Sequence, residues 1–141
     1  MKLEYWNGTA WVINTLDTCS AVAASNFSLS FPNGTTAKPN NLAACETALS
    51  LTGLSPAQSI SLSAPGTGNN GWTDVTLNLA APSGNQCSSV GAVGPVAVGL
   101  SWPWLQYHWT GAGTALQNPT ARATFGIFKK ANEFIYLREL Y

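Results

Sequence analysis

The acidic and histidine side chains are the first candidates for chemistry, because glycoside hydrolysis and general base catalysis both depend on them. Six acidic residues are scattered along the chain and share no local motif, namely Glu4, Asp17, Glu46, Asp74, Glu133 and Glu139. A glycosidase needs two carboxylates facing one sugar bond, and the sequence gives no reason to choose a pair. His108 could act as a general base or a metal ligand, but it has no partner nearby, so we favour an ordinary strand residue.

Sequence motifs for other enzyme classes are absent: there is no nucleophile elbow, no P-loop and no dinucleotide-binding fingerprint. We therefore expect no catalytic residue, no metal site and no cofactor, so that the protein is not an enzyme.

Tryptophan is the residue type that most suggests binding. The chain has six tryptophans, and Trp102-Pro103-Trp104 is closely followed by Trp109, while Trp72 adjoins a glycine at a turn. Exposed indole rings stack on the apolar faces of sugars, so Trp72, Trp102, Trp104 and Trp109 could form a carbohydrate-binding platform. The alternative, which we favour, is that these rings pack into the core or cover a sheet edge.

Three cysteines, Cys19, Cys45 and Cys87, match no zinc-binding spacing. In an oxidising compartment they predict one disulfide and one remaining thiol, with three pairings open. Cys19–Cys45 is our choice, because both residues lie beside loop-like segments and would close a modest loop. Three buried thiols in a cytosolic protein are the alternative.

The amino-acid composition limits the class of protein and the kinds of partner that it could bind. Only 9% of residues are charged, against about 25% in typical domains, and the net charge is zero. No basic stripe exists, so we expect no nucleic-acid partner. The uncharged stretch 75–121 is rich in Gly, Pro and Ser, and therefore predicts no membrane span. The composition is typical of extracellular β proteins, but no signal peptide is apparent, so we expect a fragment of a longer secreted protein.

The elements predicted with most support are strands. Residues 4–12 predict a hairpin with a type I′ turn at Asn7-Gly8, which brings Trp6 and Trp11 close together. Residues 27–31 alternate apolar and polar side chains, and 60–64 and 75–79 do the same and predict a second hairpin.

Less regular segments separate these strands. Residues 41–51 predict a short helix or an irregular crossover, 80–99 a long surface loop, 105–109 a strand and 110–120 another loop. Residues 122–141 predict a closing hairpin around a polar break at 129–132. The pattern predicts one all-β domain over 1–141, an antiparallel β-sandwich (Ig-like or jelly-roll-like) of about seven to nine short strands with long Gly/Pro/Ser loops.

Several short motifs, taken in order, resemble one bacterial family. They are Glu4-Tyr-Trp-Asn-Gly-Thr-Ala-Trp-Val12, Asp17-Thr-Cys19, Leu62-Ser-Ala-Pro-Gly66, Trp104-Leu105, Pro119-Thr-Ala-Arg-Ala-Thr-Phe-Gly126 and Tyr136-Leu-Arg-Glu-Leu-Tyr141. Together they resemble the C-terminal domain of the MSHA (mannose-sensitive haemagglutinin) pilus biogenesis protein MshQ family. An acidic loop of many relatives corresponds here to 108–113, which has no carboxylate and should bind no cation.

The resemblance implies a secreted or outer-surface protein of a Gram-negative bacterium, linked to type IV pilus biogenesis or cell adhesion and without catalysis. We therefore expect a structural interaction domain whose partners are other surface or pilus proteins, with possible self-association through edge strands. Two alternatives remain: a glycan-binding adhesin module using the four tryptophans named above, and a filament subunit assembled by strand exchange.

Overall fold

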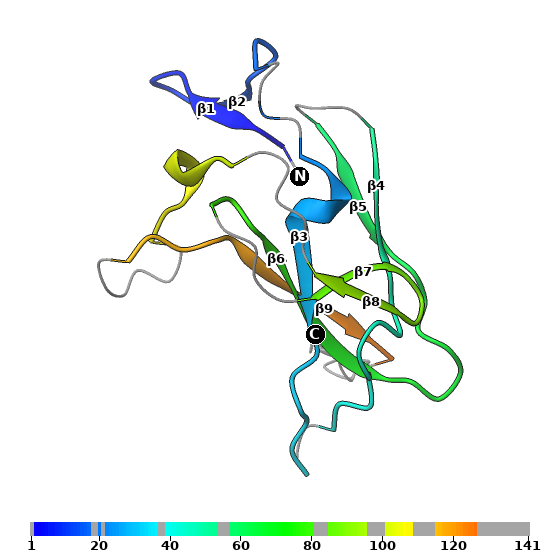
Figure 1. Cartoon of the computed structure of the whole chain (residues 1–141). Helices are drawn as coiled ribbons and strands as arrows, with labels where there is room; N and C mark the ends of the chain where they lie inside the picture. Colours follow the sequence, from blue (N-terminus) through cyan, green and yellow to red (C-terminus); the bar gives the residue numbers. More distant parts are fainter. Residues whose placement is uncertain are drawn as a thin grey trace, which may run out of the picture.

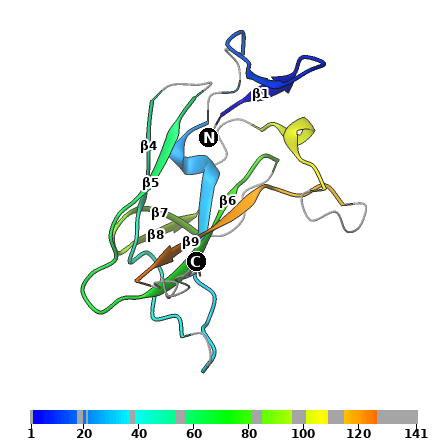
Figure 2. The same ribbon diagram turned by 180° about the vertical axis from the view of Figure 1, so that it is seen from behind.

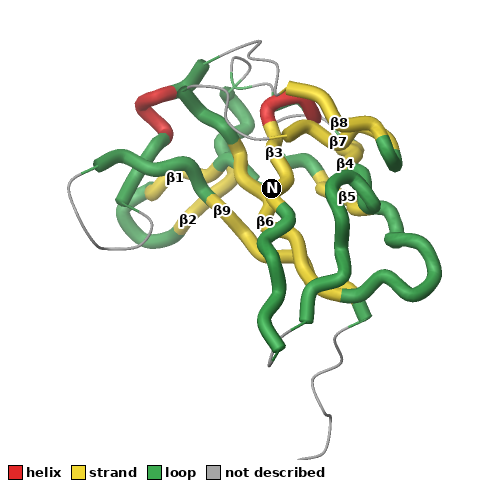
Figure 3. Tube along the Cα trace, turned by 60° about the horizontal axis from the view of Figure 1, so that its bottom comes forward, coloured by secondary structure: helices red, strands yellow, loops and turns green. Residues whose placement is uncertain are grey.

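The computed structural model describes residues 2–17, 20, 22–36, 39–53, 57–80, 85–95, 101–108 and 115–126. The regular secondary structure of the described part consists of strands, apart from two single turns of 3-10 helix (Figures 1 and 3). The strands are β1 Glu4–Trp6, β2 Trp11–Ile13, β3 Phe27–Ser30, β4 Leu49–Thr52, β5 Ser59–Leu62, β6 Gly71–Leu77, β7 Asn85–Ser89, β8 Ala92–Pro95 and β9 Thr120–Phe125. The helical turns are η1 Ala24–Asn26 and η2 Pro103–Leu105. The predicted all-β class is confirmed.

A five-stranded antiparallel sheet forms the larger layer, in the order β8-β7-β3-β6-β9. Alternation explains its inner face, because side chains two residues apart in a strand lie on the same side. Phe27 and Leu29 of β3 stand opposite Leu77 and Val75 of β6, and all four contribute to the core.

A two-stranded sheet, β4 with β5, forms the second layer and lies beside β7 and β8 when viewed from front or back (Figures 1 and 2). Leu49 pairs with Leu62, and both contribute to the same core as Phe27 and Leu29. The core therefore lies between two antiparallel sheets, which is the layered arrangement of a sandwich.

The β1–β2 hairpin projects from these two layers (Figure 1). Trp6 pairs with Trp11, as the sequence predicts. The predicted type I′ turn at Asn7-Gly8 is wrong, because the connection has four residues. The Asn7 side chain accepts hydrogen bonds from the backbone N–H groups of Thr9 and Ala10, and Gly8 adopts φ +98°.

The predicted pairing of 60–64 with 75–79 is wrong, because β5 pairs with β4 and not with β6, while β6 lies between β3 and β9. Of the two alternatives for residues 41–51, the structure shows the irregular crossover and not the helix: the segment runs through bends and turns into β4. Cys45 interrupts it with φ +58°, a left-handed conformation, and Leu49 then begins a strand that faces the core.

Two further predictions fail between residues 80 and 109. The predicted surface loop 80–99 contains the β7–β8 pair, with Gly91 (φ +78°) at its turn. The predicted strand 105–109 begins instead as η2, since proline at the first helical position favours a helical turn. Among residues 105–108, the part of that segment that the structure describes, Tyr107 alone makes a bridge, with Gln117.

The first arm of the predicted closing hairpin is strand β9, which pairs with β6. Residues 127–141 lie outside the described residues, so the hairpin itself stays a prediction.

Candidate interaction surfaces

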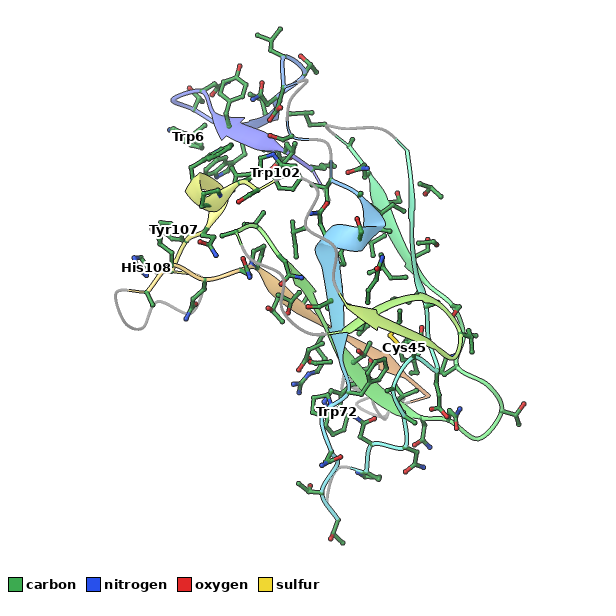
Figure 4. All side chains as sticks on the ribbon, viewed as in Figure 1. Trp6, Cys45, Trp72, Trp102, Tyr107 and His108 are labelled. Carbon is green, nitrogen blue, oxygen red and sulfur yellow. A yellow bond between two sulfur atoms is a disulfide. The ribbon has the colours of Figure 1, made fainter. Side chains whose placement is uncertain are left out.

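The described tryptophans of the candidate sugar platform, Trp72, Trp102 and Trp104, do not form one surface. Trp102 is only 3% exposed and belongs to the core, so its assignment to an exposed platform is wrong. Trp72 lies far from Trp102, toward the opposite end of the molecule (Figure 4). Trp104 is 71% exposed, and Trp109 lies outside the described residues.

Burial of Trp102 follows from its position before η2. Its backbone N–H donates to the carbonyl of Leu79, and its own carbonyl accepts from Leu105. These bonds anchor the start of the helical turn beside the end of β6, so the Trp102 ring enters the core while Trp104 faces outward. The packing interpretation is therefore confirmed for Trp102.

Two exposed aromatic rings contact each other on the projecting hairpin. Trp6 is 53% exposed and Trp11 66% exposed, and their ring centroids lie 5.7 Å apart with an interplanar angle of 59°. We call these two residues the indole pair. Sequence reasoning predicted their proximity but not their exposure, which depends on the hairpin standing outside the core.

On the outer face of the large sheet, Trp72 is covered by a salt bridge. The Arg122 Nε and Nη2 donate to the two carboxylate oxygens of Asp74 at 2.6 and 2.9 Å. The Arg122 guanidinium carbon lies 5.4 Å from the centroid of the Trp72 ring, within cation–π range. The hydrogen bond with Asp74 raises the pKa of Arg122, so this arginine keeps its charge. A ring already stacked against a guanidinium is a poorer sugar platform than the free ring of Trp104.

Asn40 holds the entrance of β6 by its side-chain amide. The amide nitrogen donates to the carbonyls of Pro32 and Trp72, and the amide oxygen accepts from the Trp72 N–H. A Cβ atom at Gly71 would overlap this amide, which explains the glycine at that position. The contact fixes Trp72 on the outer face.

His108 contacts the backbone rather than an acid. Its Nδ1 lies 3.0 Å from the carbonyl oxygen of Ala115, and its ring lies 5.8 Å from that of Tyr107. Among the described residues, no group of three or more His, Cys, Asp or Glu side chains is placed to hold a metal ion.

The disulfide joins Cys45 to Cys87, with the Cα atoms 5.1 Å apart, and the predicted Cys19–Cys45 pairing is therefore wrong. Cys45 precedes β4 and Cys87 lies in β7, so the bond links the two layers within the core (Figure 4). Sequence reasoning missed this pairing because it did not predict β7, the strand that brings Cys87 against Cys45. A disulfide of this kind is typical of oxidising compartments.

In the described part of the chain, no helix is both long and apolar enough to cross a membrane. The family model DUF6701, fourth domain, matches residues 1–140, and the chain belongs to this family. No curated protein and no solved structure matches the chain.

Proposed function

We propose that this domain is a non-catalytic structural and interaction module of a Gram-negative surface protein that acts in MSHA-like type IV pilus biogenesis or cell adhesion. The Cys45–Cys87 disulfide supports an extracytoplasmic location. The motif order described above supports the link with pili, and the family's designation as a fourth domain supports a parent protein with further domains.

The indole pair is the observation that carries the interaction role. Burial of an indole side chain removes about 150–250 Å² of its surface from water. Trp6 and Trp11 are both more than half exposed here. Covering the remaining surface of both rings would contribute roughly 5 kcal/mol at about 25 cal/mol per Å², before the costs of association. Rings of this size are enriched at the centres of protein interfaces. We infer that another surface or pilus protein covers them.

Replacement of the indole pair tests this function. Trp6→Ser with Trp11→Ser, introduced into the protein in the bacterium that produces it, should reduce pilus assembly or cell adhesion. The matched control is Val90→Ser, which removes an exposed apolar side chain that belongs to neither candidate surface. Labelling of intact cells should find both variants at normal surface levels. Unchanged adhesion and piliation with the folded double variant would refute the proposal, as would retention of the protein in the cytoplasm.

A glycan-binding adhesin module is the second candidate, and the exposure of Trp104 and Tyr107 favours it. They are 71% and 62% exposed and lie within the same short segment. Stacking of a sugar on Trp104 should change tryptophan fluorescence, and Trp104→Ala should abolish that change. A flat titration across a panel of neutral and charged glycans would exclude this candidate.

A further inference from the structure

A pocket of about 440 Å³ lies where the β1–β2 hairpin meets the turn that follows it. The described residues that line it are Tyr5 of β1, Ile13 at the end of β2, and Asn14, Thr15 and Leu16 of the turn. Its volume falls within the range of sites that bind small molecules. The pocket is therefore large enough to be a ligand site.

The pocket is separate from the indole pair, because side chains alternate along a strand. Tyr5 pairs with Val12, and the next pair along the hairpin is Trp6 with Trp11. Neighbouring positions of a strand face opposite sides, so Tyr5 lies on the face of the hairpin opposite the two indoles. Tyr5 is 49% exposed, which leaves its side chain accessible to a ligand.

Backbone hydrogen bonds hold the turn that closes the pocket. The Asn14 N–H donates to the carbonyl of Leu3, the Thr15 N–H to that of Ile13, and the Asp17 N–H to that of Asn14. Within the described part of the chain, no hydrogen bond engages the side chains of Asn14 and Thr15. Their amide and hydroxyl groups are therefore available to a ligand in the pocket.

The chemistry of the lining selects a neutral ligand with both apolar and polar surfaces. The Tyr5 ring and the aliphatic side chains of Ile13 and Leu16 can cover an apolar face, while the Asn14 amide and the Thr15 hydroxyl both donate and accept hydrogen bonds. None of the described residues that line the pocket is charged, so a charged ligand would lose its hydration without gaining an ion pair. A pyranose ring has the required character, since its C–H groups form an apolar face and its hydroxyls surround that face.

We propose that this pocket binds one neutral pyranose residue of a glycan, with its ring stacked on Tyr5 and its hydroxyls bonded to Asn14 and Thr15. The inference goes beyond the proposed function, because it assigns a ligand to the face of the hairpin that the indole pair does not occupy. The pocket is also distinct from the exposed segment of Trp104 and Tyr107. One hairpin thus offers a protein contact on one face and a sugar site on the other.

An NMR titration of the full chain with methyl glycosides tests the proposal. The probes are the methyl glycosides of glucose, galactose, mannose and N-acetylglucosamine, and N-acetylneuraminic acid is the charged comparison. At least one neutral glycoside should shift the side-chain amide signals of Asn14, with a Kd on the order of 1 mM, as expected for a small ligand on an open site. The charged sugar should not shift them.

Side-chain variants separate the roles of the ring and of the polar groups. Tyr5→Ala should weaken binding by at least about tenfold, whereas Tyr5→Phe keeps the ring and should bind within about threefold of the wild type. Thr15→Val removes the hydroxyl at nearly constant shape and should weaken binding by about threefold to tenfold. Trp104→Ala is the matched control and should leave the titration unchanged. Well-dispersed amide spectra show that each variant is folded.

Three results would overturn the proposal. Unchanged Asn14 signals with every neutral glycoside up to about 50 mM would show that the pocket takes no sugar. Shifts that Trp104→Ala abolishes and Tyr5→Ala retains would place the sugar at Trp104. Shifts caused by a proline-rich peptide but by no glycoside would identify a peptide site. Adhesion of the Trp6→Ser with Trp11→Ser variant reports on the other face of the hairpin, so either proposal can fail without the other.

Discussion

Removal of the Cys45–Cys87 disulfide should cost a large share of the stability of this domain. The two cysteines are 42 residues apart in sequence. In the chain-entropy model, a cross-link that closes a loop of this length stabilises the folded state by about 4 kcal/mol at 25 °C. Typical domains unfold with about 5–15 kcal/mol, so the loss is a large share of the total. Urea denaturation of Cys45→Ala with Cys87→Ala should show it directly.

Cys19→Ala is the matched control for this experiment, because the disulfide in the structure does not use Cys19. Its free energy of unfolding should stay within about 1 kcal/mol of the wild type. Peptide mapping without reductant should recover Cys45 linked to Cys87. The reasoning fails if mapping links Cys19 to either partner, or if Cys19→Ala loses as much stability as the double variant.

The left-handed backbone conformation of Cys45 predicts a difference in stability between two variants that lack the disulfide. Cys45 has φ +58°, a conformation that costs a non-glycine residue about 1 kcal/mol. Cys45→Gly with Cys87→Ala should therefore unfold at higher urea than Cys45→Ala with Cys87→Ala. The opposite order would mean that the left-handed conformation exists only because the disulfide imposes it.

Two further predictions concern single side chains. Trp102→Ala removes a buried aromatic ring and should lower the free energy of unfolding by about 3–5 kcal/mol. Trp104→Ala removes an exposed ring and should change it by less than about 0.5 kcal/mol. Equal effects of the two variants in thermal melts would contradict the positions assigned to these rings. Asn40→Ala leaves the backbone groups of Pro32 and Trp72 without their hydrogen-bond partner and should lower the free energy of unfolding by about 2–3 kcal/mol. Asn33 is an exposed asparagine nearby in sequence, and Asn33→Ala should leave chemical denaturation nearly unchanged.

Predictions from sequence succeeded where the signal is local. Aromatic and β-branched residues on both sides of Asn7-Gly8 specify a hairpin without help from distant residues. The alternation of Phe27 and Leu29 specifies a strand in the same way. Strand existence was therefore predictable for β1, β2, β3, β5, β6 and β9.

Strand pairing was not predictable, because it depends on contacts between distant residues. β5 and β6 are neighbours in sequence, yet β6 pairs with β3 and β9, and the Asn40 amide packs against Gly71 at its first residue and binds Trp72. β7 and β8 are rich in small and polar residues with little intrinsic β propensity, and they form strands because β3 and the disulfide position them.

The candidate surfaces show the same limit at the level of single residues. Trp102 and Trp104 are two positions apart, and a strand would have placed both rings on one face. The helical turn that Pro103 begins separates them instead, one into the core and the other into solvent. Composition alone gives the number of tryptophans but does not show which of them are buried and which are exposed.

The buried interactions within and between the two layers lie away from the surfaces proposed for interaction. The disulfide links the layers, Thr47 donates to the carbonyl of Ser63 beside the β4–β5 sheet, and Thr73 donates to that of Ser30 within the large sheet; both threonines are fully buried. The indole pair belongs to a separate hairpin and contributes nothing to the buried core cluster of the described residues. Its replacement should therefore leave urea unfolding of the domain almost unchanged. If Trp6→Ser with Trp11→Ser instead unfolds the sheets, the pair is structural and the interaction role loses its main support.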